Sequence, residues 1–408
     1  MKTFRGVFTQ QEPLPEAAIE AAIAVMRSGR LHRYNTLPGE AGEAALLERE
    51  FARMLDVPYC LATTSGGTAM QIALAGSGVG AGGKVLTNGF TLAPVPGAID
   101  AVGAEPVLVE TTEDLTIDLA DLQAKATASG ARTLLLSHMR GHLADMDALT
   151  DLTERVGLTL IEDCAHTMGA AWRGRASGTW GHAACFSTQT YKHANSGEGG
   201  LLTTGDADLM ARAIIRSGSY MLHDRHGTPP PAEAFADARL ETPNCSSRMD
   251  NLRAALLRPQ LALLEAQVER WNARYRVLEE GLRRSSHLVL RRIPANESHV
   301  GSSIQFRAPR LSDTEIQAAI ATCAERGVEL KWFGAPVPHG YTSTHRSWRY
   351  INPQDLPETD RILSTLVDMR IPLTFSEDDC ALIAEIIIEV FDAAHAERHE
   401  VTDAEIDA

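Results

Sequence analysis

Residues 133–163 read "TLLLSHMRGHLADMDALTDLTERVGLTLIED", and this stretch decides the fold. Two short apolar runs, "TLLLSH" (133–138) and "LTLIED" (158–163), flank a helical stretch. Runs of this kind, apolar on both faces, are typical of strands buried inside a parallel sheet. A strand, a helix and a second strand in this order favour a doubly wound α/β domain.

The same alternation continues on both sides of this unit. Amphipathic helices are expected over 14–28 and 40–55. Further apolar runs lie at "KVLT" (84–87), "PVLVE" (106–110), "AACFS" (183–187) and "GLLTT" (200–204). The chain is therefore predicted to be an α/β protein with a large, mainly parallel sheet.

A long helical stretch over about 249–283, interrupted by Pro259, follows the predicted sheet. Beyond it, "SDTE" (312–315) and "SEDD" (376–379) resemble capping boxes that open helices. We predict three segments: an N-terminal arm with the large α/β domain over 1–250, a linking helix over 251–283, and a smaller C-terminal α+β domain over 284–408. The charged tail "HEVTDAEIDA" is expected to fray.

Composition narrows the class of protein. The chain has 408 residues and a formal net charge of −15, which disfavours a nucleic-acid or anionic-membrane surface. No apolar run approaches the roughly 20 residues that span a bilayer, and "MKTFRGVFTQ" has no apolar signal core. The six cysteines form no CxxC pair, so we predict reduced thiols, no metal site and a cytoplasmic location.

Polar side chains follow several of the predicted strands. Ligands of open α/β sheets collect at the carboxyl ends of strands, and His138, Asp163 and Ser187 lie at such ends. Asp163 could equally cap a helix or be a solvated loop acid. The stretch "TTSGGTAMQIAL" (63–74) places small residues before a helix, where backbone N–H groups can bind an anion. An ordinary glycine-rich turn is its simpler interpretation.

Lys192 stands alone in the polar stretch "STQTYKHANSGEGG" (187–200). A lysine in a pocket can have a lowered pKa and form a Schiff base with a carbonyl group. Pyridoxal phosphate (PLP) needs such a lysine, a carboxylate facing its pyridine nitrogen, and a phosphate cradle. Lys192, Asp163 and the turn at 65–69 with Ser187 are candidates for these three parts. Considered by itself, Lys192 would be interpreted as a solvated surface residue. Together with Asp163 and the turn at 65–69, it predicts a PLP site.

The chain resembles the DegT/StrS family of PLP-dependent aminotransferases of fold type I, many of which aminate keto-sugars. The matching stretches fall in family order over roughly 14–390, which is nearly the whole chain. They are "SGGTAMQIALAGSGVGAGGKVLT", "GAEPVLVE", "SHMRGHLADMDAL", "LIEDCAHTMGA", "CFSTQTYKHANSGEGGLLTT", "RMDNLRAALLRPQL" and "IPLTFSEDD". The resemblance implies a doubly wound, mainly parallel large domain and a smaller α+β domain.

The resemblance also implies roles for single residues. Lys192 matches the Schiff-base lysine, Asp163 the acid paired with the pyridine nitrogen, and His166 a residue near the cofactor's phenolic oxygen. The phosphate positions match Gly67, Thr68, Ala69 and Ser187. In this family a neighbouring subunit completes the phosphate site through an Asn-x-Arg segment, which here offers Arg248 with either Asn244 or Ser246.

Two positions depart from the family pattern. The ring that usually stacks on the cofactor is replaced by Leu92, which can still cover the cofactor by dispersion. Phe90 lies two residues before this stacking position, so its side chain is expected to point away from the cofactor. The asparagine that commonly follows the lysine is His193. These departures bear on the substrate more than on PLP binding.

Candidate substrate residues lie in two predicted loops, and His193, Arg140 and Arg370 are further candidates. "GRLHRYN" (29–35) offers Arg33, Tyr34 and Asn35, although a polar surface turn explains it equally well. "KWFGAPVPHGYTS" (331–343) offers Trp332, which could equally belong to the core.

Arg140 and Arg370 lie in otherwise apolar runs, where an unpaired arginine is costly. A structural ion pair with Asp163, Asp145 or Asp368 is the favoured interpretation. The alternative is a fork that grips a substrate carboxylate.

We therefore predict a biosynthetic, homodimeric aminotransferase with its active site at the subunit interface. Glutamate or glutamine would give its amino group to a keto-sugar or related carbonyl compound by a ping-pong reaction through the Lys192 Schiff base (aldimine). One alternative is a PLP-dependent dehydratase, decarboxylase or cyclase acting on an amino-acid-like substrate, because fold and cofactor residues do not separate these reactions. Another is a non-catalytic PLP-binding regulatory protein.

Overall fold

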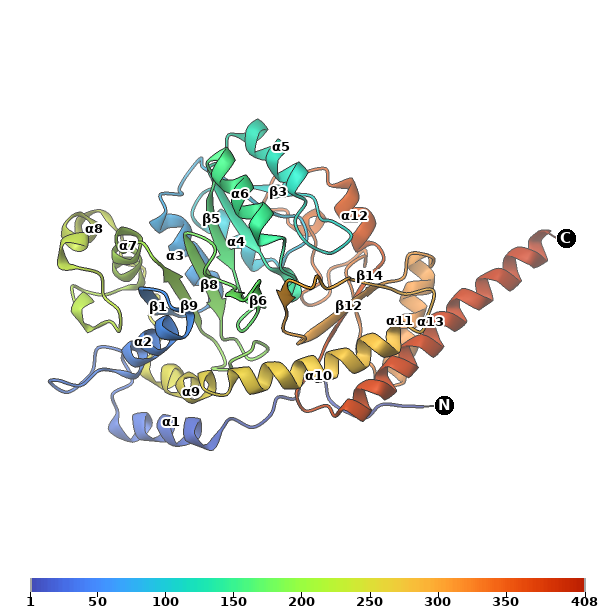
Figure 1. Cartoon of the computed structure of the whole chain (residues 1–408), viewed down its shortest axis with the longest axis horizontal. Coiled ribbons are helices and arrows are strands. Elements are labelled where there is room, and N and C mark those ends of the chain that lie inside the picture. The colour runs from blue at the N-terminus through green and yellow to red at the C-terminus, as the bar shows by residue number, and fades with distance from the viewer. Residues whose placement is uncertain (1, 407–408) are drawn as a thin grey trace.

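The computed structural model describes residues 2–406, and a seven-stranded sheet forms its centre (Figure 1). The strand order is β1-β9-β8-β5-β4-β2-β3. Only β9 runs against its neighbours, so the sheet is mainly parallel, as predicted. The strands are β1 (Tyr59–Thr63), β2 (Lys84–Asn88), β3 (Glu105–Val109), β4 (Thr133–Ser137), β5 (Thr159–Asp163), β8 (Ala183–Ser187) and β9 (Gly200–Thr204).

Helices cover both faces of this sheet (Figure 1). One face packs on α3 (Gly66–Gly76), α4 (Pro94–Ala101) and α7 (Ala207–Ser217), with α8 (Phe235–Glu241) beside α7. The other face packs on α5 (Leu119–Ser129), α6 (Met146–Val156), α2 (Glu43–Leu55) and α9 (Asn251–Leu261). In β4, Leu135 enters the first core while Leu134 and Leu136 enter the second. Because successive side chains of a strand point to opposite faces, this burial explains the apolar run.

A second, antiparallel sheet has the order β10-β12-β14-β13. Its strands are β10 (Val289–Leu290), β12 (Ser303–Arg307), β13 (Lys331–Trp332) and β14 (Leu366–Arg370). It packs on α10 (Leu264–Leu282), α11 (Asp313–Glu325) and α13 (Glu377–Ile406). Phe4 and Phe8 of the N-terminal arm belong to the same core, where both contact Phe375 edge-on.

Smaller elements connect these two sheets. A short three-stranded sheet joins β11 (Glu297–Ser298) to β6 (Ala171–Trp172) and β7 (Arg175–Ala176), so it links segments that are far apart in the sequence. Helix α1 (Glu16–Ser28) lies along α9, and α12 (Pro357–Leu363) precedes β14. No helix within residues 2–406 combines the length and the hydrophobicity that crossing a membrane requires.

Two sequence predictions need comment. The stretch 249–283 is not one helix: α9 continues through Pro259 to Leu261, and α10 begins at Leu264. Both predicted caps are present, since Ser312 with Glu315 and Ser376 with Asp379 exchange side-chain to backbone hydrogen bonds.

The domain limits at 250 and 283 stay a prediction, and Phe4 and Phe8 pack in the C-terminal core rather than against the large sheet. The backbone of α13 is helical to Ile406. The tail 399–408 was predicted to fray, but its backbone continues α13 over 399–406, and only 407–408 lie outside the described residues.

Candidate active site

Asp163 ends β5 at the edge of the large sheet, beside Ser137 at the end of β4. The Ser137 hydroxyl donates to Asp163 Oδ2 at 3.1 Å, and the Ala165 N–H donates to Asp163 Oδ1 at 3.1 Å. Thr91 in turn donates to the Ser137 hydroxyl at 2.8 Å. Burial raises the pKa of Asp163, while the Ala165 N–H and the Lys192 charge lower it. The carboxylate is therefore held in one orientation by neighbours on three segments.

Lys192 lies in the turn that connects β8 to β9, and its Nζ is 2.9 Å from His166 Nε2. Burial lowers the pKa of Lys192 to about 7. The charge of Asp163 acts in the opposite direction, whereas the nearby Arg140 and Arg370 lower the pKa further. A neutral amine near pH 7 is the nucleophile that Schiff-base formation requires.

The glycines after Lys192 are required by close packing. A Cβ atom on Gly200 would lie 2.3 Å from the Ser65 carbonyl carbon, and one on Gly199 would lie 2.3 Å from the Thr188 hydroxyl. The return into β9 therefore has no room for side chains at these two positions. This packing brings the start of β9 against the turn before α3.

The buried amine makes the stability of the cofactor-free protein depend on pH. The folded pKa of about 7 lies below the ordinary value of 10.5, so the folded state binds fewer protons between these values. The free energy of unfolding therefore rises with pH across this window, and the penalty is fully present below pH 7. Relative to Lys192→Met, the wild type is expected to gain about 2 to 3 kcal/mol between pH 7 and pH 9.

Urea unfolding of the cofactor-free wild type and Lys192→Met at both pH values measures this difference. Lys84 is exposed at the start of β2, so Lys84→Met serves as the control and should follow the wild type. Parallel pH curves for the wild type and Lys192→Met would contradict the assignment of Lys192 as a buried neutral amine.

Two histidines lie beside Lys192, and both are neutral. Burial, followed by the Lys192 charge, lowers the pKa of His166 well below its usual value. Burial likewise lowers the pKa of His193 to about 3. His193 Nε2 lies 3.0 Å from the Ser302 hydroxyl, and its ring meets Trp271 edge-on at 5.2 Å. His193 thus connects the lysine turn to the C-terminal part of the chain.

The first turn of α3 lies against the end of β8. Ser65 caps α3 and accepts from the Thr68 N–H at 3.0 Å. A Cβ atom on Gly66 would lie 2.9 Å from the Ser187 Cβ, whereas one on Gly67 would be in ordinary contact with the Ser65 hydroxyl at 3.7 Å. The first N–H groups of a helix have no intrahelical acceptor and attract anions. Gly67 and Ser187 are therefore brought together as a candidate phosphate cradle, beside Thr68, whose N–H is taken by the Ser65 cap.

Ala69 does not fit this cradle as the sequence predicted. Its side chain is fully buried, and its N–H already donates to the Ser65 carbonyl at 3.0 Å. The helical hydrogen bond therefore occupies the donor that was expected to face the phosphate.

The segment before α9 carries the residues predicted for a neighbouring subunit's site. Asn244 and Ser246 are exposed, and Asn244 Oδ1 accepts from the Ser246 N–H at 3.1 Å. Arg248 donates to the Gly218 carbonyl at 2.8 Å, and its guanidinium lies 5.1 Å from the centre of the Tyr220 ring. Their role toward a partner stays a prediction.

Arg33 and Tyr34 are structural, contrary to the prediction of a substrate role. Arg33 is 4% exposed and donates to both oxygens of Glu48, at 2.9 and 3.0 Å. The Tyr34 hydroxyl lies 2.7 Å from His226 Nε2, and His226 also contacts Glu48. The buried Glu48 carboxylate needs these partners. Asn35 is exposed, and its N–H donates to the His32 carbonyl as in an ordinary polar turn.

Arg140 forms the predicted structural ion pair, so a substrate role for its guanidinium is not supported. Its Nε donates to Asp368 Oδ1 at 2.7 Å, and its Nη2 contacts Asp368 Oδ2. Trp332 is also placed in the core rather than in a pocket, with its indole N–H donating to the Ser364 carbonyl at 2.7 Å. The polar groups of both side chains therefore bond to residues that are distant in the sequence, and not to a ligand.

Leu92 is half-buried and packs against a cluster that contains Phe90. Phe90 is 1% exposed and meets Phe333 edge-on at 5.1 Å, so it points into the core as expected. The role of Leu92 as a cover for the cofactor stays a prediction.

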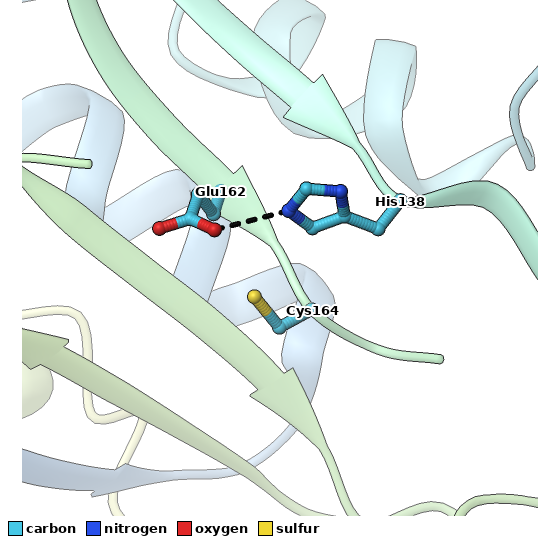
Figure 2. A group of neighbouring side chains, drawn as sticks. All are labelled: His138, Glu162 and Cys164. Atoms are coloured by element: carbon cyan, nitrogen blue, oxygen red, sulfur yellow. Dashed lines mark hydrogen bonds and ion pairs between the residues drawn. The ribbon is translucent and has the colours of Figure 1, made fainter. Parts of the chain in front are cut away.

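His138, Glu162 and Cys164 form a second buried group (Figure 2). Their ligand atoms lie within 4.8 Å of one another. His138 Nε2 is 3.0 Å from Glu162 Oε2, and the Glu162 oxygens also accept the N–H groups of residues 178, 180 and 181. Burial opposes ionisation, but these hydrogen bonds hold the pKa of Glu162 below its usual value. Glu162 thus anchors the loop before β8, and its lone pairs are already in use.

A cleft of about 360 Å³ opens beside Lys192. His193 and Arg370 line it, together with several residues that the sequence analysis did not identify. The latter include Tyr191, Gln260, Gln267, Trp271, Ser302 and part of the N-terminal arm. Tyr191 adjoins the predicted lysine, but the others carry no local sequence signal because they are brought in by α9, α10 and the second sheet.

Several curated relatives of this chain are named as aminotransferases. An L-glutamine:2-deoxy-scyllo-inosose aminotransferase of Streptomyces fradiae is 31% identical over 336 residues, which are 80% of this chain and 78% of that relative. Its counterpart from Micromonospora echinospora is 34% identical over 283 residues, 67% of this chain and 66% of the relative. A dTDP-3-amino-3,4,6-trideoxy-alpha-D-glucose transaminase of Streptomyces venezuelae is 37% identical over 262 residues, 63% and 62% of the two chains.

Solved structures share the fold. The crystal structure of 3-amino-5-hydroxybenzoic acid synthase has a TM-score of 0.81 and 24% identity, and covers 96% of this chain and 99% of that one. DesV of S. venezuelae has a TM-score of 0.76 and 28% identity, with 92% and 94% covered. The DegT/DnrJ/EryC1/StrS aminotransferase family matches residues 14–388, and the chain belongs to this family.

Proposed function

We propose that this aminotransferase moves an amino group from L-glutamine or L-glutamate to the ketone of a cyclic polyol or sugar, by a ping-pong reaction. Lys192 carries the proposal: its side chain is half-buried beside the cleft, and its amine has a pKa of about 7 and lies 2.9 Å from His166 Nε2. Relatives named for glutamine, inosose and dTDP-sugar substrates support the choice of donor and acceptor.

The residues fit PLP, the cofactor that membership of the family implies. Lys192 would hold its aldehyde carbon, Asp163 would face its ring nitrogen, and the start of α3 with Ser187 would hold its phosphate. A Cβ atom at Gly66 would fill the space between α3 and Ser187, which is consistent with a close backbone approach there. When bound, PLP supplies an electron sink that allows a bond at the donor α-carbon to ionise.

The protein's own groups supply binding and proton transfer. A pKa of about 7 leaves a large part of the Lys192 amine unprotonated near neutral pH, so it can accept the proton from the donor α-carbon and later give it back. Asp163 keeps its orientation through Ser137 and Ala165 and stabilises positive charge opposite it. His166, neutral and next to the lysine Nζ, fixes the amine.

The two half-reactions test this proposal separately. With PLP bound, L-glutamine alone should shift the cofactor absorbance to that of the pyridoxamine form, and scyllo-inosose should then restore the starting spectrum. A dTDP-linked ketosugar is the comparison acceptor. Turnover of an amino acid without accumulation of the pyridoxamine form would contradict transamination and favour elimination or decarboxylation.

We further propose a cytoplasmic homodimer whose subunits complete each other's sites. The exposure of Asn244 and Ser246 supports an additional contact with a partner, and the six free cysteines are in keeping with a reducing compartment. Light scattering measures the assembly, with a dimer expected at micromolar concentration.

A further inference from the structure

Arg370 carries a guanidinium with no acid partner in the cleft that contains Lys192. Asp368 and Arg370 share one face of β14, because side chains two residues apart point the same way. Asp368 is fully committed, since it pairs with Arg140 and also accepts from Gln305 at 2.6 Å and from Tyr341 at 2.5 Å. Across residues 2–406, the Arg370 guanidinium makes neither a hydrogen bond nor an ion pair.

Two aromatic rings hold Arg370 in place. Its guanidinium lies 3.8 Å from the centre of the Tyr191 ring and 5.5 Å from that of Tyr341. Tyr341 is itself tied by its hydroxyl to Asp368. Stacking uses the faces of a guanidinium and leaves the N–H groups at its edge available. None of the Arg370 side-chain nitrogens is sealed away from solvent without a partner. The donors are therefore oriented and open.

The position of Arg370 points to a ligand that reacts at Lys192. Both residues line the same cleft, and the positive charge of Arg370 contributes to the lowered pKa of Lys192. The other arginine that lines the cleft, Arg270, is already bound by both oxygens of Glu12, at 2.9 and 2.5 Å. Only one unpaired cation of the described chain therefore faces the cleft. A single guanidinium edge matches a carboxylate, whereas a diphosphate requires more cationic donors.

We propose that Arg370 binds the α-carboxylate of the amino donor and so selects an amino acid as the first substrate. The inference rests on the proposed function, and it names the residue that recognises the donor. The proposed acceptor is a neutral polyol and has no carboxylate for the Arg370 guanidinium to bind. The amino donor does have one, so a role in donor binding accounts for a guanidinium in this cleft. Tyr191 acts as a positioning residue, because it touches Arg370 and adjoins Lys192.

The test compares L-glutamine with 4-aminobutanamide, which is glutamine without its α-carboxylate. In PLP-bound Arg370→Gln, kcat/KM of the donor half-reaction with glutamine is expected to fall about 10²-fold, mainly through KM. The reaction with 4-aminobutanamide should not change, so the preference for glutamine collapses. Arg370→Lys should retain part of the preference. The acceptor half-reaction with scyllo-inosose, started from the pyridoxamine form, should keep its rate.

Arg175→Gln is the matched control, because Arg175 is stacked 4.3 Å from the centre of the Trp180 ring yet lies outside the cleft. Cofactor absorbance and circular dichroism show that each variant is folded, and Arg370→Lys carries the comparison if the glutamine variant does not accumulate. An unchanged preference for glutamine in both Arg370 variants overturns the inference. A loss confined to the acceptor half-reaction overturns it as well. Failure of the wild type to react with any amino acid contradicts the proposed function itself.

Discussion

Lys192→Ala is expected to lose aminotransferase activity by at least about 10⁴-fold in kcat, because one side chain both attaches the cofactor and transfers the proton. No neighbour can replace it, because the imidazoles of His166 and His193 cannot form a Schiff base, and His193 is turned toward Ser302. The half-reaction with L-glutamine, followed by cofactor absorbance, measures the loss.

The same variant should also lack the absorbance band of lysine-bound PLP, while free PLP added to it keeps its own spectrum. Lys84→Ala, at an exposed position, is the control and should retain full activity. An alanine variant that still converts glutamine within tenfold of the wild-type rate would remove Lys192 from the mechanism.

Asp163→Asn is expected to reduce kcat by about 10³-fold while the fold is preserved. Asparagine keeps the size of the side chain and can still accept the Ala165 N–H through its oxygen, but it loses the negative charge and puts an NH2 group where Oδ2 accepts from the Ser137 hydroxyl. That charge faces the place proposed for the cofactor ring nitrogen, where it stabilises positive charge. Half-reaction rates at saturating glutamine measure the effect.

Asp145→Asn is the matched control, since Asp145 is an exposed aspartate that caps α6 by accepting from the Ala148 N–H. It should alter stability slightly and leave kcat unchanged. Equal kcat values for Asp163→Asn and the wild type would show that the carboxylate only caps the turn after β5.

Much of the large sheet could be predicted because its strands are buried on both faces. The runs that became β4, β5, β8 and β9 are apolar by necessity, and Asp163 and Lys192 stand out as polar residues at their ends. The chemistry of the cofactor site was therefore accessible from local sequence. The second sheet was less accessible, since β10 and β13 are only two residues long.

The roles of the arginines could not be assigned from local sequence. Arg33 and Glu48 are 15 residues apart, and Arg140 and Asp368 are 228 apart, so each pair depends on the completed fold. Glu48 offered a faint signal as a carboxylate within the apolar part of an amphipathic helix. Asp368 forms an ion pair with Arg140 and leaves Arg370 without an acid partner among the described residues. The residues that flank the two arginines in the sequence do not indicate which of them Asp368 pairs with.

The Arg140–Asp368 pair has a mechanical consequence. It fastens the turn after β4 to β14, and thus the large sheet to the C-terminal lobe, at a point that water does not reach. A hinge rotation that separated the lobes would have to break this ion pair and its charge-assisted hydrogen bonds. The clamp therefore resists such rotation, and the shape of the cleft is set before any substrate arrives.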